Sequence, residues 1–248
     1  MILKCLGSSS AGNCYLLENN TECLILEAGI KLKEVKKALD FNISKVVGVV
    51  VSHSHNDHFR YAKEYLKAGI KVYASEETHK TLLKEYDSQV IVRAGYWYQI
   101  GGFNVTPFRC EHDVECFGYI IKHEDMGTLL FATDTSFIRY NFHNLKLNHI
   151  MIEANYSKKI VDGYLENNTI DQARVNRTMQ THMEFETTKE FIRTNKTSSL
   201  DSITLLHLSD CNSNAEQFQK DIQELTGNYT RVAVAAKGVE VELSLFPW

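Results

Sequence analysis

The sequence has 248 residues, 44% of them hydrophobic and 23% charged, which is the composition of a globular protein and excludes a disordered or fibrous chain. Its 27 Lys and Arg residues against 31 Asp and Glu residues give a net charge of −4. That balance argues against a protein that binds nucleic acid over its whole surface, so any such contact would need a local patch.

The start of the chain lacks a basic region followed by a continuous apolar stretch, and no run approaches about 18 apolar residues. The six cysteines form no CxxC pair, which predicts reduced, buried thiols and makes a zinc knuckle an unfavoured interpretation. We therefore expect a cytoplasmic protein without membrane contact.

Short apolar runs typical of β-strands alternate with turns and amphipathic helices along most of the chain. The predicted strands lie at 2–6, 14–18, 23–27, 46–52, 71–74, 103–109, 117–122, 128–132, 150–154, 202–208 and 239–245. Helices are predicted around 32–39, 61–66, 187–194 and 215–225. This periodicity allows either two packed sheets with helices outside them or one doubly wound sheet.

A polar segment at 155–183 is too long for an ordinary connector, and we interpret it as a functional insertion in a single domain spanning 1–248. It carries four cations that are candidates for binding a phosphate-bearing substrate, namely Lys158, Lys159, Arg174 and Arg177. The plainer interpretation is a set of solvated charges. Tyr156, Tyr164 and Phe59 are candidates for stacking on a base, or for packing.

Residues 50–59 read VVSHSHNDHF, with ligand-type side chains directly behind an apolar strand. His53 and His55 project to one side if the chain stays extended, because side chains in a strand alternate. His58 follows His55 by about one turn if a helix begins near Asp57. Imidazoles and carboxylates suit Zn²⁺ and similar ions, and two ions roughly 3.5–4 Å apart would use all four groups. The alternative is a histidine-rich surface turn.

The HSHNDH stretch resembles the H-x-H-x-D-H signature of the metallo-β-lactamase fold, and further ligand-type residues follow later β runs in RCEHDV, LLFATDTS and ITLLHLSD. The resemblance implies an α/β (α+β) fold, a four-layer αβ/βα sandwich. It also implies that one ion is bound by His53, His55 and His112, and the other by Asp57, His58 and His207, with Asp134 bridging both.

The blocks LGSSSAGNCYLLE, CEHDVECFGYII, IEANY and LLHLSD resemble those of the WalJ/YycJ-like branch of this superfamily, the presumed exonucleases, over nearly the whole chain. This resemblance implies a nuclease or exonuclease acting on DNA or RNA. One residue departs from the pattern. Glu27, in LILEAG, stands where the branch usually has an aspartate that supports the ligands by hydrogen bonding, so its extra methylene changes that geometry.

A pair of Zn²⁺ or Mn²⁺ ions would make a metal-bridging hydroxide available at neutral pH, with Asp57 helping to align it. Glu153 in MIEANY and His182 in QTHME resemble the pair that transfer-RNA-processing phosphodiesterases of this fold place beside the scissile phosphate. A carboxylate raises the pKa of a neighbouring imidazole, and the protonated ring can then protonate a leaving alkoxide. The plainer interpretation is an ordinary strand-end acid and a polar residue near a helix start.

The favoured hypothesis is thus a dinuclear metal-dependent phosphodiesterase, a nuclease acting on nucleic acid. The alternative is a phosphodiesterase of small nucleotides such as cyclic mononucleotides, with the insertion acting as a lid or reaching the partner in a homodimer. A binding protein that has lost catalysis is a third hypothesis, disfavoured by the intact ligand set. A lactamase or glyoxalase-type hydrolase would leave Glu153 and His182 without a role.

Overall fold

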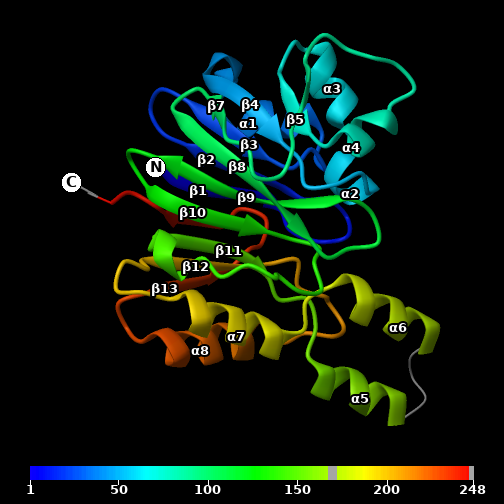
Figure 1. Ribbon diagram of the computed structural model, residues 1–248, viewed down its shortest axis with the longest axis vertical. Coiled ribbons are helices and arrows are strands. Elements are labelled where there is room, and N and C mark those ends of the chain that lie inside the picture. Colours follow the sequence, from blue (N-terminus) through cyan, green and yellow to red (C-terminus); the bar gives the residue numbers. More distant parts are fainter. Residues whose placement is uncertain (167–171, 246–248) are drawn as a thin grey trace.

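The computed structural model of the protein describes residues 1–166 and 172–245; the side chains of 166 and 172–174 lie outside the description. The described residues form two seven-stranded mixed sheets that pack face to face, with helices on the outer sides (Figure 1). This arrangement confirms the predicted four-layer sandwich and is not the doubly wound sheet that the periodicity also allowed.

The first sheet takes most of its strands from the N-terminal part of the chain. In spatial order it contains β14 (Glu240–Glu242), β1 (Ile2–Gly7), β2 (Cys14–Glu18), β3 (Cys23–Leu26), β4 (Val46–Val50), β5 (Val72–Ala74) and β6 (Gln89–Ile91). Strands β3 to β6 run parallel to one another.

The second sheet is built from the later strands. In spatial order it contains β13 (Arg231–Val234), β12 (Ser202–Leu206), β11 (His149–Glu153), β10 (Gly127–Ala132), β9 (Cys116–His123), β8 (Phe103–Cys110) and β7 (Tyr98–Ile100). Strands β10 to β13 are parallel, so their carboxyl ends meet at one edge, as those of β3 and β4 do in the other sheet.

Helices cover the outer faces of both sheets, and two of them project from the body (Figure 1). The first sheet adjoins α1 (Leu32–Ala38), α2 (Asn56–Phe59), α3 (Ala62–Lys67) and α4 (Glu76–Lys80); the second is covered by α7 (Phe185–Asn195) and α8 (Ala215–Thr226). The projecting helices are α5 (Lys158–Glu166) and α6 (Gln172–Thr181), and short 3₁₀ turns lie at Ile43–Lys45 and His143–Leu145. In the described part of the chain, no helix combines the length and the apolar character needed to cross a membrane.

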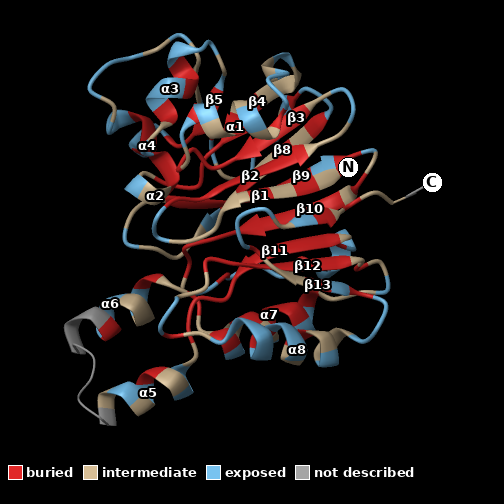
Figure 2. Ribbon diagram, turned by 180° about the vertical axis from the view of Figure 1, so that it is seen from behind, coloured by how far each residue is buried: buried red, intermediate tan, exposed pale blue. Residues whose placement is uncertain are grey.

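Most strands are apolar on both faces because each sheet is covered on both sides (Figure 2). A central cluster that includes Tyr15, Phe103 and Phe131 fills the space between the sheets, and separate clusters lie beneath the outer helices. Strands β6, β7 and β13 were not predicted, since runs of three or four residues give little periodic signal.

Two hydrogen bonds join the sheets where the predicted ligands begin. The hydroxyl of Tyr119 in β9 donates to the carbonyl of Val51 at 2.6 Å, and the N–H of Phe117 donates to the carbonyl of Ser52 at 3.0 Å. Both carbonyls directly follow β4, at the point where the chain turns towards His53. The two contacts therefore fix the end of β4 against the start of β9.

Replacing Tyr119 with Phe should lower the free energy of unfolding by about 1–3 kcal/mol, because the buried carbonyl of Val51 would lose its partner. Urea unfolding followed by circular dichroism measures the change. The matched control is Tyr229→Phe, at a hydroxyl-bearing ring that is 97% exposed, where the change should stay within about 0.5 kcal/mol. Equal stabilities of the two variants would contradict this account of how the sheets are joined.

Candidate metal centre

The seven predicted ligands lie together at the edge where the carboxyl ends of the strands meet. His53 and His55 follow β4, and Asp57 and His58 lie within α2. His112 lies in the β8–β9 turn. Asp134 follows β10, and His207 follows β12. Asp134 and His207 have positive φ angles of 47° and 52°, uncommon for residues with a side chain. Such strained backbone turns are typical of functional sites, and here they stand directly behind the strands.

His53, His55, His112 and Asp134 form one group, in which one potential ligand atom from each lies within 4.8 Å of the others. His112 Nδ1 donates to the carbonyl of Thr181 at 2.9 Å, and this leaves Nε2 to face His55 Nδ1 at 3.2 Å. A backbone partner on one ring nitrogen fixes the tautomer and frees the other nitrogen as a ligand.

Asp57, His58, Asp134 and His207 form the second group by the same distance criterion, so Asp134 belongs to both. One oxygen of Asp134, Oδ1, lies 3.3 Å from His58 Nε2 and 3.1 Å from His207 Nδ1. Asp57 Oδ2 lies 3.2 Å from His58 Nε2 and 3.4 Å from His207 Nε2. The carboxylates therefore alternate with imidazoles around a shared centre.

Burial and neighbouring charge act in opposite directions on these groups. Burial alone would raise the pKa of the Asp134 carboxyl, but the charges of His207 and His58 hold it well below its usual range. Burial likewise opposes the charged form of His207, yet the carboxylates of Asp134, Asp57 and Glu153 raise its pKa to about 10. For His53 burial dominates and lowers the pKa well below its usual range.

Three buried imidazole nitrogens of the predicted ligands, His53 Nε2, His58 Nδ1 and His207 Nε2, make no hydrogen bond to any residue in the described part of the chain. Buried polar atoms are otherwise almost always satisfied, so such orphaned donors and acceptors require an explanation. Imidazole nitrogens and carboxylate oxygens are also the ligand types that divalent ions such as Zn²⁺ accept. The His/Asp cluster is therefore compatible with a divalent metal site.

Glu153 and His182 form a pair at the margin of the cluster. Glu153 is fully buried, and its Oε1 lies 2.7 Å from His182 Nδ1 and 3.2 Å from His207 Nδ1. Its Oε2 accepts hydrogen bonds from the N–H groups of Thr135 and Met183 at 3.0 and 3.1 Å. Burial opposes the protonated form of His182, but the charge of Glu153 prevails and raises its pKa.

Glu27 lies behind the cluster, with a positive φ of 70° directly after β3. Its carboxylate accepts a hydrogen bond from the N–H of Ser52 at 3.2 Å, and Oε2 lies 3.5 Å from His58 Nδ1. A carboxylate behind a histidine can orient that ring, and this supporting role of Glu27 stays a prediction.

A cleft of about 510 Å³ opens over the cluster, and its walls include Asp113, Arg177 and His182. Arg177 is the predicted cation that reaches the cleft, with one guanidinium nitrogen 3.8 Å from Asp113. Lys158 and Lys159 are exposed at the start of α5 and do not line this cleft, so their contact with substrate stays a prediction.

The remaining candidates in and near the insertion have different surroundings. The side chain of Arg174 lies outside the described residues. Phe59 and Tyr156 are buried, so they pack and are not available for stacking on a base. The insertion itself forms α5 and α6, and a small apolar cluster of Tyr156, Val161 and Val175 joins these helices to the body.

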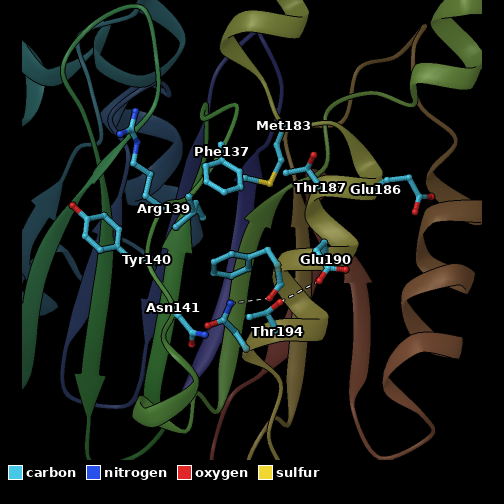
Figure 3. A pocket seen from close by; sticks show the side chains of 12 residues that line it. Phe137, Arg139, Tyr140, Asn141, Met183, Glu186, Thr187, Glu190 and Thr194 are labelled. Atoms are coloured by element: carbon cyan, nitrogen blue, oxygen red, sulfur yellow. Dashed lines mark hydrogen bonds between the residues drawn. The ribbon is translucent and has the colours of Figure 1, made fainter.

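A separate cavity of about 540 Å³ lies between the loop around Phe137–Asn141 and α7 (Figure 3). Figure 3 shows Met183 and Phe137 at one end of this cavity, with Glu186 and Glu190 on the α7 side. Its lining includes none of the seven predicted ligands, so the candidate metal site adjoins the cleft and not this cavity.

Sequence reasoning did not single out Asn13. Its fully buried amide donates to Asp57 Oδ2 at 3.3 Å and lies 3.0 Å from His58 Nε2. The backbone N–H of His207 also donates to Ser8 Oγ at 2.9 Å. Ser8 and Asn13 belong to the GSSSAGN stretch, and their contacts with His207 and Asp57 are not apparent from the sequence.

A model of the Metallo-beta-lactamase superfamily matches residues 9–156, more than half of the chain. The chain belongs to this superfamily. The predicted family is thereby confirmed, and the cleft at the ligand cluster is its candidate active site.

Two relatives within this superfamily are exodeoxyribonucleases. Exodeoxyribonuclease YycJ of Bacillus anthracis is 27% identical over 145 residues, which cover 54% of each chain. Exodeoxyribonuclease WalJ of Streptococcus pneumoniae is 24% identical over 172 residues, which cover 63% of each chain. The matched segments thus span between half and two thirds of these proteins.

Among solved structures, the metallo-β-lactamase fold protein YhfI of Bacillus subtilis superimposes with a TM-score of 0.74 at 16% identity. The superposition covers 97% of this chain and 98% of YhfI. At this identity the likeness shows the fold, and it extends over nearly the whole chain.

Replacing Asp134 with Ala should remove bound divalent metal, because this carboxylate belongs to both ligand groups. Metal analysis after dialysis against a weak chelator measures the loss, and circular dichroism checks that the variant is folded. Asp87→Ala, at an exposed position away from the cleft, is the control and should retain the metal content of the wild type. Unchanged metal in Asp134→Ala would rule out the proposed ligand role.

Proposed function

We propose that this chain is a metal-dependent phosphodiesterase, a nuclease that works with two divalent ions. The observation that carries the proposal is the Glu153–His182 pair, whose 2.7 Å contact stands beside the His/Asp cluster. A metal centre that activates water serves lactams, thioesters and phosphate esters alike. A protonated imidazole next to it suits a reaction with an anionic phosphate and a leaving alkoxide.

Three overlapping groups of ligand-type residues share Asp134, and the two that lack His182 would each hold one ion. His53, His55 and His112 would hold one, and Asp57, His58 and His207 the other, with Asp134 between them. When bound, Zn²⁺ or Mn²⁺ would supply hydroxide from water at neutral pH and offset the negative charge of the phosphate. Both metals accept these ligand types, so the donors do not select between them.

The protein's own groups would divide the remaining work. Asp57, held by the amide of Asn13 at 3.3 Å, would orient the attacking water. His182 would hold one proton on Nδ1, donated to Glu153, and present a second on Nε2. It would give the Nε2 proton to the oxygen that leaves as the phosphodiester breaks. Glu153 acts as a positioning residue, because its carboxylate sets the orientation and pKa of that ring.

YycJ and WalJ are exodeoxyribonucleases, and the similarity of this chain to them supports a nucleic-acid substrate. The second candidate is a phosphodiesterase of cyclic mononucleotides. The cleft volume of about 510 Å³ favours it, since that size suits a small ligand, and so does the net charge of −4.

His182→Ala should lower kcat by roughly 10²- to 10⁴-fold, the usual range for an acid–base residue, with metal content unchanged. Steady-state hydrolysis of a phosphodiester, together with metal analysis, measures both quantities. His143→Ala changes an exposed histidine outside the cleft and should behave as the wild type. Loss of metal in His182→Ala would instead identify the residue as a ligand and overturn its assigned role.

The proposed function itself is tested by assaying single- and double-stranded DNA, RNA and cyclic nucleotides with Mn²⁺ and with Zn²⁺. Cleavage of nucleic acid, with a KM that rises steeply as the salt concentration rises, would support the nuclease hypothesis. Each protein–phosphate contact releases counterions, and salt opposes that release. Hydrolysis of cyclic nucleotides alone, with little dependence on salt, would favour the second candidate. The absence of phosphodiester cleavage under all these conditions would refute both.

A further inference from the structure

Two of the three histidines that would hold the first ion, His53 and His112, each have a partner on the ring nitrogen Nδ1. His53 Nδ1 lies 2.8 Å from the hydroxyl oxygen of Ser52, and His112 Nδ1 donates to the carbonyl of Thr181 at 2.9 Å. These contacts leave Nε2 of both rings for the ion. Histidine ligands are commonly held in this way, since a partner on the second nitrogen fixes the tautomer and the orientation of the ring.

His55, the third of these histidines, is oriented the other way round. Its Nδ1 lies 3.2 Å from His112 Nε2, so Nε2 is the nitrogen left for a partner. The carboxylate oxygen Oδ1 of Asp113 lies 3.3 Å from His55 Nε2 and 3.1 Å from His112 Nε2. In the described part of the chain, the group of potential ligand atoms within 4.8 Å of one another contains both histidines but not Asp113. Asp113 thus stands beside the donor group and not within it.

The turn that carries Asp113 is fixed to the neighbouring strand end. Asp113 follows His112 between β8 and β9, and the residue before them, Glu111, makes two hydrogen bonds to the segment after β10. The N–H of Glu111 donates to Thr135 Oγ1 at 3.0 Å, and its carbonyl accepts from the N–H of Ser136 at 3.0 Å. The carboxylate therefore projects from a braced turn.

Asp113 has a second charged neighbour, Arg177 in α6, which leaves Oδ1 available. A guanidinium nitrogen of Arg177 lies 3.8 Å from the other carboxylate oxygen, Oδ2. The Arg177 side chain is 74% exposed, and ion pairs of this kind contribute little. A negative charge beside His55 Nε2 favours the tautomer that carries its proton on Nε2, which leaves Nδ1 as the ligand atom.

We propose that Asp113 is a positioning residue that holds the His55 ring through Nε2 and so turns Nδ1 towards the first ion. The inference rests on the two-ion centre of the proposed function, but not on which bond that centre cleaves. It implies that Asp113 controls the affinity for one ion and leaves the affinity for the other unchanged.

The probe is Co²⁺, which accepts imidazole and carboxylate ligands and absorbs visible light when they bind it. Metal-free protein is titrated with Co²⁺ in the presence of a competing chelator, and the absorbance gives the affinity of each bound ion. Asp113→Ala should weaken one of the two ions by about 10- to 100-fold, the usual effect of removing such a partner. Asp113→Asn should lose less, because its amide oxygen can still accept a hydrogen bond from Nε2.

The matched control is Asp210→Ala. Asp210 is an exposed carboxylate that lines the same cleft, and within the described residues it forms no ion pair or hydrogen bond with a predicted ligand. Both affinities of this variant should equal those of the wild type. At saturating Co²⁺, the spectrum of Asp113→Ala should also equal that of the wild type, because the ligands themselves are unchanged.

Three results would overturn the role of Asp113. Affinities in Asp113→Ala equal to those of the wild type would show that the carboxylate does not act on the ion. Equal weakening of both ions would indicate a general structural defect. A changed spectrum at saturation would identify Asp113 as a ligand. One weakened ion, in a protein that binds two ions but cleaves no phosphodiester, would support the role of Asp113 and contradict the proposed function.

Discussion

The buried carboxylate of Asp134 is the constraint around which the rest of the molecule is organised. Its side chain is 3% exposed, and a charge so far from water is tolerated only where opposite charge or hydrogen bonds compensate. His58 and His207 approach its Oδ1 at 3.3 and 3.1 Å, and His53 approaches Oδ2 at 3.9 Å. His53 and His58 follow a strand of the first sheet, and His207 follows a strand of the second. The strands of both sheets must therefore end at one edge of the molecule.

Buried contacts between the two sheets hold the ends of their strands together at this edge. Tyr119 and Phe117 fix the end of β4 against β9, while the apolar layers on both faces of each sheet stabilise the whole. Positive φ angles at Glu27, Asp134 and His207 each cost about 1–3 kcal/mol. The apolar cores offset this cost at the cluster.

The cluster and the Glu153–His182 pair divide the chemistry between them. The His/Asp cluster is a feature of a hydrolase superfamily with many substrates, so it indicates water activation without selecting a bond. Glu153 contacts both His182 and His207, so it couples the proposed acid to a proposed ligand. That coupling is the feature on which the choice of a phosphodiester depends.

The sequence by itself determined a set of ligand-type residues and, through the resemblance of its motifs, the family and the four-layer sandwich, because ligand spacing and motif blocks are local properties of the chain. Strand periodicity alone left two architectures open. Only the tertiary structure placed Asn13 against Asp57, 44 positions away, and Thr181 against His112, 69 positions away. It also decided that the polar segment forms α5 and α6. Such contacts depend on how distant segments pack, and no local pattern encodes that.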